Sequence, residues 1–167
     1  MSQPRFGLPY FYVTWICALI SGEDRCRWAT WFKSRHSYTK VADEDFDSAG
    51  YNIVHKELLN RRADELKTAG WAVTTERQNQ FKYRGKVAVI GGKPDIVAVD
   101  HAAQRVLISD AKTGVRMNKH IVQVMIYMAI WPRVHREVVG YDISGEVYYG
   151  DGVQIVISSG DLTSDNV

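Results

Sequence analysis

The sequence has only two cysteines, Cys17 and Cys26, among its 167 residues. Two cysteines cannot supply the disulfide framework on which many small secreted domains depend. Neither cysteine has Cys or His neighbours at the paired spacing typical of a zinc site. We therefore expect reduced thiols and a cytoplasmic, intracellular protein.

Long hydrophobic runs are also missing from the sequence. The longest apolar stretch, residues 11–20, contains Thr14 and is far shorter than the roughly 20 residues that a membrane-spanning helix requires. It is a poor signal peptide too, because it lacks a clearly basic leader and a convincing cleavage site. Internal repeats and low-complexity tracts are absent. We therefore predict a single domain over residues 1–167 that has no membrane partner.

Acidic residues are scarce in the middle of the chain, where basic residues accumulate. Residues 71–140 carry eleven Lys or Arg against five Asp or Glu, although the net charge of the whole chain is only +2. This segment could bind a phosphate backbone, and a solvated basic face would explain the same composition equally well. Its basic residues include Arg77, Lys82, Arg84, Lys86, Lys93, Arg116 and Lys119.

The first 40 residues have the composition of a helical N-terminal part. Residues 9–20 and 24–36 are rich in apolar and aromatic side chains, and Ser21 and Gly22 mark a break between them. The second segment has two interpretations: its aromatic side chains stack on bases, or it is an amphipathic helix that covers the core. The residues concerned are Trp28, Trp31, Phe32 and Tyr38, which lie near Arg25, Arg27, Lys33 and Arg35.

Two longer helices are predicted further along the chain. Residues 47–69 form one, since they contain no proline and Gly70 stands where a C-terminal cap belongs. Residues 118–130 form the other, because Asn118 can cap its start and Pro132 cannot continue it.

The remaining segments have the alternation and the turn residues of β-strands. The C-terminal part, residues 138–167, is predicted to be β-rich, with a hairpin or meander over 138–157. The fold class is therefore α/β, with a central mixed β-sheet flanked by helices. The other strands are expected at 71–75, 78–90, 94–99 and 105–111.

Three charged residues on the predicted strands form a candidate catalytic set. Asp95 begins one strand, and Asp110 and Lys112 follow at the end of the next. Alternation along a strand places Asp110 and Lys112 on the same face, and Asp95 can meet them if the two strands are neighbours. Each residue alone is weak evidence, because an Asp-x-Lys sequence is more often a salt bridge at a strand end.

The chemistry of this set suits phosphodiester hydrolysis. Carboxylates hold hard cations such as Mg²⁺ or Mn²⁺, and such an ion polarises a phosphate and lowers the pKa of bound water. The ammonium of Lys112 can orient that water and offset developing negative charge.

Two helical positions add to the set. Gln123 and Tyr127 lie on one helical face and could reach together toward a nucleic-acid backbone or toward Lys112. His55 falls inside the apolar stripe of the 47–69 helix, whereas Glu57 points nearly the opposite way. A histidine there is often only a core residue, but a neutral imidazole can bind Mn²⁺. Sequence favours His55 over Glu57 as a metal ligand and leaves both open.

With these residues in order, the chain resembles the RecB-like branch of the PD-(D/E)XK nucleases, which includes the CRISPR-associated adaptation exonucleases. The resemblance covers about residues 50–130. It consists of four ordered motifs: a glycine-led helix with a histidine (Gly50 to His55), Gly-x-x-Asp (Gly92 to Asp95), acid-x-Lys before Thr-Gly (Asp110 to Gly114), and Gln-x-x-x-Tyr (Gln123 to Tyr127).

The resemblance implies a restriction-endonuclease-like core with the element order αβββαβ, in a protein of prokaryotic or viral (phage) origin. It implies Mg²⁺ or Mn²⁺ held by His55, Asp95, Asp110 and the carbonyl of Ala111. Lys112 would be the catalytic lysine, and Gln123 and Tyr127 would complete the catalytic set. Many members of this branch carry four cluster cysteines, whereas this chain has two, so no iron–sulfur cluster is expected.

The function expected from the resemblance is metal-dependent hydrolysis of DNA phosphodiester bonds, by an exonuclease or an enzyme that prefers single strands. The alternative is a catalytically inactive DNA-binding or interaction subunit of a DNA-processing complex. Expected partners are DNA, which could be single-stranded, and either a second copy of the chain or a helicase or recombination protein. The residues expected to bind nucleic acid are Arg84, Lys93, Arg116, Lys119 and His120.

Overall fold

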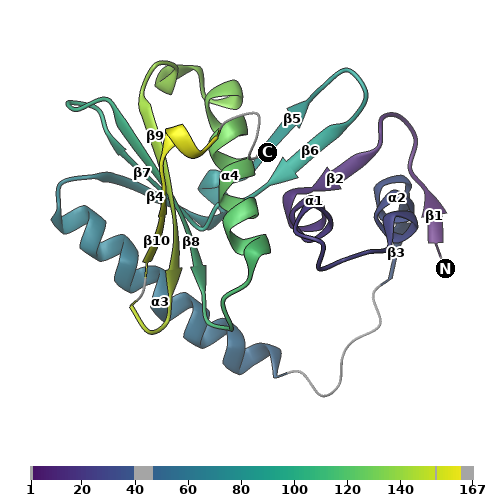
Figure 1. The fold of residues 1–167 in the computed structure, drawn as a ribbon, viewed down its shortest axis with the longest axis horizontal. Helices are drawn as coiled ribbons and strands as arrows, with labels where there is room; N and C mark the ends of the chain where they lie inside the picture. The colour runs from purple at the N-terminus through teal and green to yellow at the C-terminus, as the bar shows by residue number, and fades with distance from the viewer. Residues whose placement is uncertain (1, 40–46, 153, 163–167) are drawn as a thin grey trace.

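A computed structural model describes residues 2–39, 47–152 and 154–162. The ends of the predicted N-terminal part, Met1 and Lys40, lie outside the described residues, as do residues 153 and 163–167 of the predicted C-terminal part. Within these ranges the chain is a mixed α/β structure with several sheets and four α-helices (Figure 1), which confirms the predicted class. None of the helices in these ranges has the length and apolar character needed to cross a lipid bilayer.

A five-stranded mixed sheet forms the centre of the fold. Its strands stand in the order β10-β9-β8-β7-β4, and β8 and β9 run parallel while the other neighbouring pairs are antiparallel. The predicted C-terminal hairpin is the β9–β10 pair. The strands are β4 (Ala72–Thr75), β7 (Ile96–Asp100), β8 (Arg105–Lys112), β9 (Asp142–Tyr149) and β10 (Gln154–Ile157).

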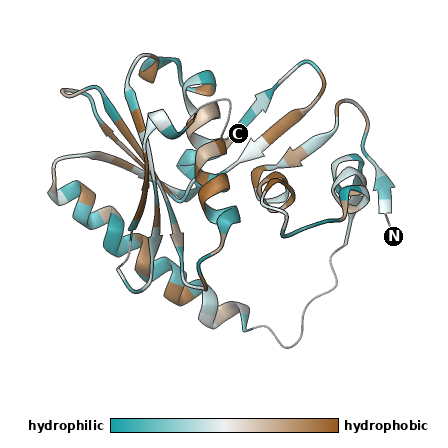
Figure 2. Ribbon diagram, viewed as in Figure 1, coloured by the Kyte–Doolittle hydropathy of each residue, from teal (hydrophilic) through white to brown (hydrophobic). Residues whose placement is uncertain are grey.

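Helices α3 (Ser48–Thr68) and α4 (Asn118–Val134) cover opposite faces of this sheet (Figure 1). Side chains alternate along β7, so Val97 joins the core beneath α4 while Ile96 and Ala98 join the core beneath α3. Apolar residues run along the central strands and recur on both helices (Figure 2). Each face buries a separate cluster, and the sheet is held from both sides.

Helix α3 has nearly the predicted bounds because its ends are determined locally. The Asp47 side chain accepts a hydrogen bond of 2.9 Å from the Gly50 amide at the start, and Gly70 has a φ of +90° just beyond the end. Such a φ is accessible to glycine at little cost.

Helix α4 corrects two predictions. Asn118 is its first residue rather than its cap, and no side chain caps the helix at Met117. The helix also continues through Pro132 to Val134. Proline removes one backbone hydrogen bond, but Ile130 and Trp131, directly before Pro132, are buried in the core and hold the last turn in place.

The N-terminal part is less helical than predicted. It contains β1 (Ser2–Pro4), β2 (Tyr10–Tyr12), α1 (Val13–Ile20), α2 (Arg27–Arg35) and β3 (His36–Tyr38). The expected helix over 9–20 therefore begins only at Val13. The three residues before it pair instead with a strand about 80 positions later in the chain, in a parallel arrangement.

The segment predicted as one strand over 78–90 is a short helix and two strands. A 3₁₀ helix, η1 (Glu76–Asn79), precedes β5 (Phe81–Arg84) and β6 (Val89–Gly92). Strand β6 pairs with β5 on one side and with β2 on the other, which makes a second, three-stranded sheet. This sheet joins the N-terminal part to the central one, and α1 packs against α4. Two further 3₁₀ helices are η2 (Arg136–Val138) and η3 (Ser159–Asp161).

Candidate active site

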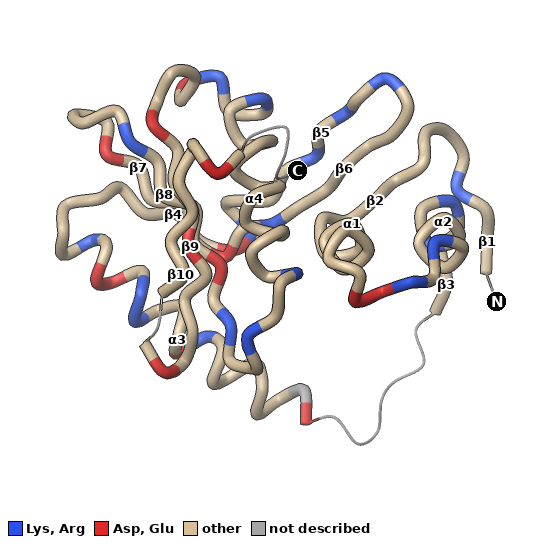
Figure 3. The backbone as a smooth tube through the Cα atoms, in the orientation of Figure 1, with Lys and Arg blue, Asp and Glu red and all other residues tan. Residues whose placement is uncertain are grey.

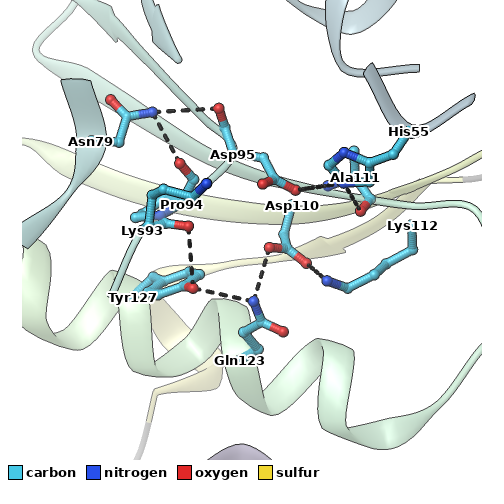
Figure 4. A network of polar contacts seen from close by, with 10 residues as sticks. All are labelled: His55, Asn79, Lys93, Pro94, Asp95, Asp110, Ala111, Lys112, Gln123 and Tyr127. Carbon is cyan, nitrogen blue, oxygen red and sulfur yellow. Dashed lines mark hydrogen bonds and ion pairs between the residues drawn. The ribbon is translucent and has the colours of Figure 1, made fainter. Parts of the chain in front are cut away.

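The end of the β7–β8 pair brings the predicted carboxylates together. Ile96 is paired with Ser109, so Asp95, one residue before β7, lies beside Asp110 and Ala111 on β8. The Asp95 carboxylate accepts a hydrogen bond of 2.9 Å from the Ala111 amide (Figure 4). Strand pairing therefore places Asp95 and Asp110 side by side, as alternation along the two strands predicts.

Asp110 is the most enclosed member of the group, with 1% of its surface exposed. One carboxylate oxygen accepts a 3.0 Å hydrogen bond from the Gln123 amide, and the other forms an ion pair with the ammonium of Lys112 (Figure 4). Burial raises the pKa of Asp110, and the nearby Asp95 raises it further, while Lys112 opposes both. The carboxylate would thus gain from any additional cation close to it.

Lys112 keeps its positive charge although it is largely enclosed. Burial alone lowers the pKa of a lysine, but the Asp110 and Asp95 carboxylates outweigh this and raise the pKa of Lys112 above its usual value. The ammonium is therefore available as a charged donor at the floor of the site.

His55 extends from α3 to the same group. Its Nε2 lies 3.3 Å from an Asp95 carboxylate oxygen and 3.2 Å from the Ala111 carbonyl oxygen. With a proton on Nε2 the ring can donate to both, and the bond to Asp95 raises the pKa of His55. Glu57 is exposed and borders a separate surface hollow with Val54 and Arg61. Of the two helical candidates, the structure brings only His55 to the carboxylates.

Gln123 and Tyr127 are both buried, and Gln123 contacts Asp110 rather than Lys112. The Gln123 amide donates to Asp110 and, over 3.1 Å, to the Tyr127 hydroxyl. That hydroxyl donates in turn to the Lys93 carbonyl at 3.4 Å. Burial raises the pKa of Tyr127, so the hydroxyl remains a proton donor. Both residues line the pocket beside the carboxylates, so the expected reach toward a nucleic-acid backbone stays a prediction.

A pocket of about 480 Å³ opens beside the carboxylates. Its floor includes His55, Asp95, Asp110, Lys112 and Gln123, and strand β2, helix α1 and η1 supply the rest of the wall. Gly91 and Gly92 allow this arrangement. A side chain at Gly91 would collide with the Tyr10 ring, and one at Gly92 would collide with Phe81 and Tyr127.

Asn79 is a supporting residue that the sequence pattern missed. It is 1% exposed, and its amide donates to the Thr74 carbonyl at 3.1 Å. The same amide donates to the Pro94 carbonyl at 3.2 Å (Figure 4). These bonds tie η1 to the backbone immediately before Asp95. Residue 79 falls inside the strand expected over 78–90, whereas η1 ends at Asn79 and β5 begins at Phe81, so a break before Phe81 is needed to recognise it.

The residues predicted to bind nucleic acid fall into three groups. Lys93 is exposed and lines the pocket. Arg84 is exposed on the β5–β6 hairpin, where several basic residues gather away from the pocket (Figure 3). Arg116 forms an ion pair with Asp151, and Lys119 forms one of 2.9 Å with Glu23.

The prediction for His120 needs correction. It is 7% exposed, and its Nδ1 lies 3.1 Å from the Tyr149 hydroxyl inside the protein. Burial lowers the pKa of His120 to about 4. A neutral, enclosed ring at the start of α4 is a packing residue rather than a contact for a phosphate.

Helix α2 does not cover the core in the way one interpretation expected. Trp28 and Trp31 are 65% and 51% exposed, and the helix packs through Thr30 and Ser34 instead. The Trp28 ring stacks on Phe32 of the same helix. Its aromatic residues therefore remain on the surface.

The donor atoms of the site suit a hard divalent cation in kind. Two carboxylates and a carbonyl supply oxygen, and His55 supplies nitrogen. Within the described part of the chain, no three His, Cys, Asp or Glu side chains are already arranged to hold an ion. Asp95 faces His55 and the Ala111 amide, and Asp110 faces Lys112, so these contacts would have to open.

No protein-family model matches the chain, and no curated protein matches it. Among solved structures, the crystal structure of SSO0001 is similar to it with a TM-score of 0.47 and 15% sequence identity. That match covers 92% of this chain and 69% of the other. The interpretation of the site therefore depends on its own geometry.

Proposed function

We propose that the protein is a metal-dependent nuclease of the PD-(D/E)XK type, similar to the RecB-like branch, and that it hydrolyses DNA. The observation that carries the proposal is the convergence of Asp95, Asp110 and Lys112 in one pocket, joined there by His55. Residues far apart in the sequence meet at one end of the β7–β8 pair, where a phosphodiester could reach them.

The order of elements supports a restriction-endonuclease-like core. Helix α3 is followed by the antiparallel strands β4, β7 and β8, then by α4 and by β9, which lies parallel to β8. This is the αβββαβ order that the sequence resemblance implies, with the β5–β6 hairpin inserted between the first two strands. The candidate catalytic residues stand on its second and third strands.

Asp95, Asp110 and the Ala111 carbonyl would hold Mg²⁺ or Mn²⁺, with His55 as a fourth ligand when its Nε2 carries no proton. Such an ion polarises a phosphate and lowers the pKa of bound water. Lys112 would leave Asp110 and turn its ammonium toward the attacking water and the charge that develops on phosphate. Gln123 would remain bonded to Asp110 and keep that carboxylate in orientation.

One observation favours a second candidate, an inactive nuclease-fold module that binds DNA or a protein partner. Both carboxylates already have cationic or hydrogen-bonding partners within the chain. A site that has lost its metal would be stabilised in this way. The intact set of Asp95, Asp110 and Lys112 argues for the enzyme, because a decayed site loses its members.

Cleavage of end-labelled linear and circular single-stranded DNA in Mg²⁺ or Mn²⁺ tests the proposal. Lys112→Ala should lower the rate at least about a hundredfold while the fold, measured by circular dichroism, persists. Lys119→Ala is the matched control, because Lys119 pairs with Glu23 and does not line the pocket. Cleavage by Lys112→Ala at the wild-type rate would refute the site. DNA binding with neither cleavage nor detectable binding of Mg²⁺ or Mn²⁺ would favour the inactive module.

A further inference from the structure

One wall of the pocket consists of residues that have no role in the proposed hydrolysis. It is formed by strand β2 and the start of α1 on one side and by η1 on the other. The side chains that matter here are Tyr10, Tyr12, Arg77 and Lys93, and all four line the same pocket as the carboxylates.

The aromatic part of this wall is held rigidly. The Tyr10 and Tyr12 ring centroids lie 5.0 Å apart, and the Tyr12 and Trp15 centroids lie 4.9 Å apart, both with edge-to-face geometry. Tyr10 lies against Gly91, where no side chain could be accommodated. Tyr12 nevertheless keeps 42% of its surface exposed. A fixed, partly exposed ring can stack on a base at little entropic cost.

The basic part of the wall consists of Arg77 and Lys93, which share the pocket with the Asp95 and Asp110 carboxylates. Arg77 and Lys93 are exposed, and among the described residues neither makes an ion pair. Arg116 and Lys119 differ, because Asp151 and Glu23 neutralise them. The available positive charge is therefore at the pocket rather than at the start of α4.

The size of the pocket limits what can enter it. A volume of about 480 Å³ accommodates a group of nucleotide size, since pockets of roughly 300–1,000 Å³ hold small molecules. A base in a duplex is stacked and paired, so it cannot lie against Tyr12 at the pocket without leaving the helix. An unpaired strand pays no such cost.

We propose that Tyr12, Arg77 and Lys93 form the binding site for an unpaired strand, with one base stacked on Tyr12 and the neighbouring phosphates bound by the two basic side chains. This rests on the proposed nuclease function and names the side chains that hold the strand beside the carboxylates. Tyr10 supports the Tyr12 ring as a positioning residue.

Binding measured without metal separates this site from catalysis. Fluorescence anisotropy of a labelled oligothymidylate in EDTA should give a Kd about tenfold higher for Tyr12→Ala and within about twofold of wild type for Tyr12→Phe, because the phenyl ring still stacks. Arg77→Gln should raise the Kd and make its salt dependence shallower by about 0.7, the value for one phosphate contact on a single strand. The matched control, Arg116→Gln, should leave both unchanged.

A blunt duplex of the same length should bind at least about tenfold more weakly than the single strand. Equal affinity for both, or a larger loss in Arg116→Gln than in Tyr12→Ala and Arg77→Gln, would overturn the inference. If the strand binds through Tyr12 but no cleavage follows when Mg²⁺ or Mn²⁺ is added, the binding site stands and the nuclease proposal fails. If Tyr12→Ala cleaves DNA at the wild-type rate at low substrate concentration, the nuclease proposal stands and the binding site at Tyr12 fails.

Discussion

The two ends of the β7–β8 strand pair carry the same kinds of residue in different surroundings. At one end Asp100 binds Arg105 at 2.8 Å, and both side chains are partly exposed, by 25% and 52%. At the other end Asp110 binds Lys112 beneath α4, and the Asp110 side chain is 1% exposed. The hydrogen bond from Arg105 lowers the pKa of Asp100, whereas burial raises the pKa of Asp110.

The difference shows how burial changes the meaning of an ion pair. An exposed pair contributes little to stability because water screens it. Water also solvates its charges, so the carboxylate gains little from a further cation. A buried carboxylate with a raised pKa is costly to maintain and gains from another cation. The exposed pair therefore needs no role beyond the hairpin, and the raised pKa of Asp110 beside the pocket supports the proposed function.

The largest effect on activity should come from substituting the aspartate at the buried end, with the aspartate at the exposed end as the control. Asp110→Asn removes the charge that the proposed metal requires, so DNA cleavage should fall on the order of a thousandfold or more. Asp100→Asn, on the same strand pair, should cleave within about twofold of wild type because its carboxylate is far from the pocket. Comparable losses of cleavage rate in both variants would contradict the proposed difference between the two ends of the strand pair.

The Arg62–Glu146 pair is a buried ion pair outside the pocket, so it tests the effect of burial on stability without the effect on activity. Glu146 is 1% exposed and is held by two bonds from Arg62, at 2.7 and 2.8 Å, yet neither lines the pocket. Arg62→Met should cost about 3 kcal/mol of unfolding free energy, because it leaves a buried carboxylate without its partner. Urea denaturation measures this.

The double variant Arg62→Met with Glu146→Leu should recover most of that loss, since two apolar groups can replace a buried pair. Cleavage should be unaffected in either variant under conditions where the protein is folded. A loss of activity that persists in the stable double variant would assign Glu146 to the site.

His120 gives a smaller, pH-dependent effect near the buried end. Burial lowers its pKa in the folded protein to about 4, below the ordinary value of about 6.5. The unfolded chain therefore binds the proton more tightly, and stability falls as the pH falls from about 6.5 toward about 4. Relative to His120→Gln, the wild type should lose roughly 2 kcal/mol between pH 7 and pH 5. Parallel pH profiles for the two proteins would contradict this.

The smallest effect is expected at the exposed end. Arg105→Ala should change the unfolding free energy by less than about 1 kcal/mol, and the remaining difference should shrink in high salt. Thermal unfolding at two salt concentrations measures it. A cost as large as that of Arg62→Met would mean that exposure does not distinguish the two pairs.

Local features explain what could be predicted from the sequence. The bounds of α3 follow from Asp47 and Gly70, and the meeting of Asp95 with Asp110 follows from alternation on adjacent strands. The direction of His55 follows from helical periodicity. Each of these depends on residues within a few positions of one another or on one strand pairing.

Long-range partners explain what could not be predicted. Residues 10–12 became a strand because they pair with β6, and α4 passes Pro132 because the core holds its last turn. Two of the basic residues that the sequence favoured for DNA, Arg116 and Lys119, pair with Asp151 and Glu23, which lie 35 and 96 positions away. Asn79 contacts Pro94 across 15 positions. No local pattern contains these pairings.

Calorimetric titration with Mn²⁺ tests the central claim most directly, because it asks whether Asp95 and Asp110 share one ion. The wild type and Asp100→Asn should bind Mn²⁺ alike, whereas Asp95→Asn and Asp110→Asn should each bind at least about tenfold more weakly. Absence of binding by the wild type, or equal binding by Asp110→Asn and Asp100→Asn, would contradict a metal centre at this end of the sheet.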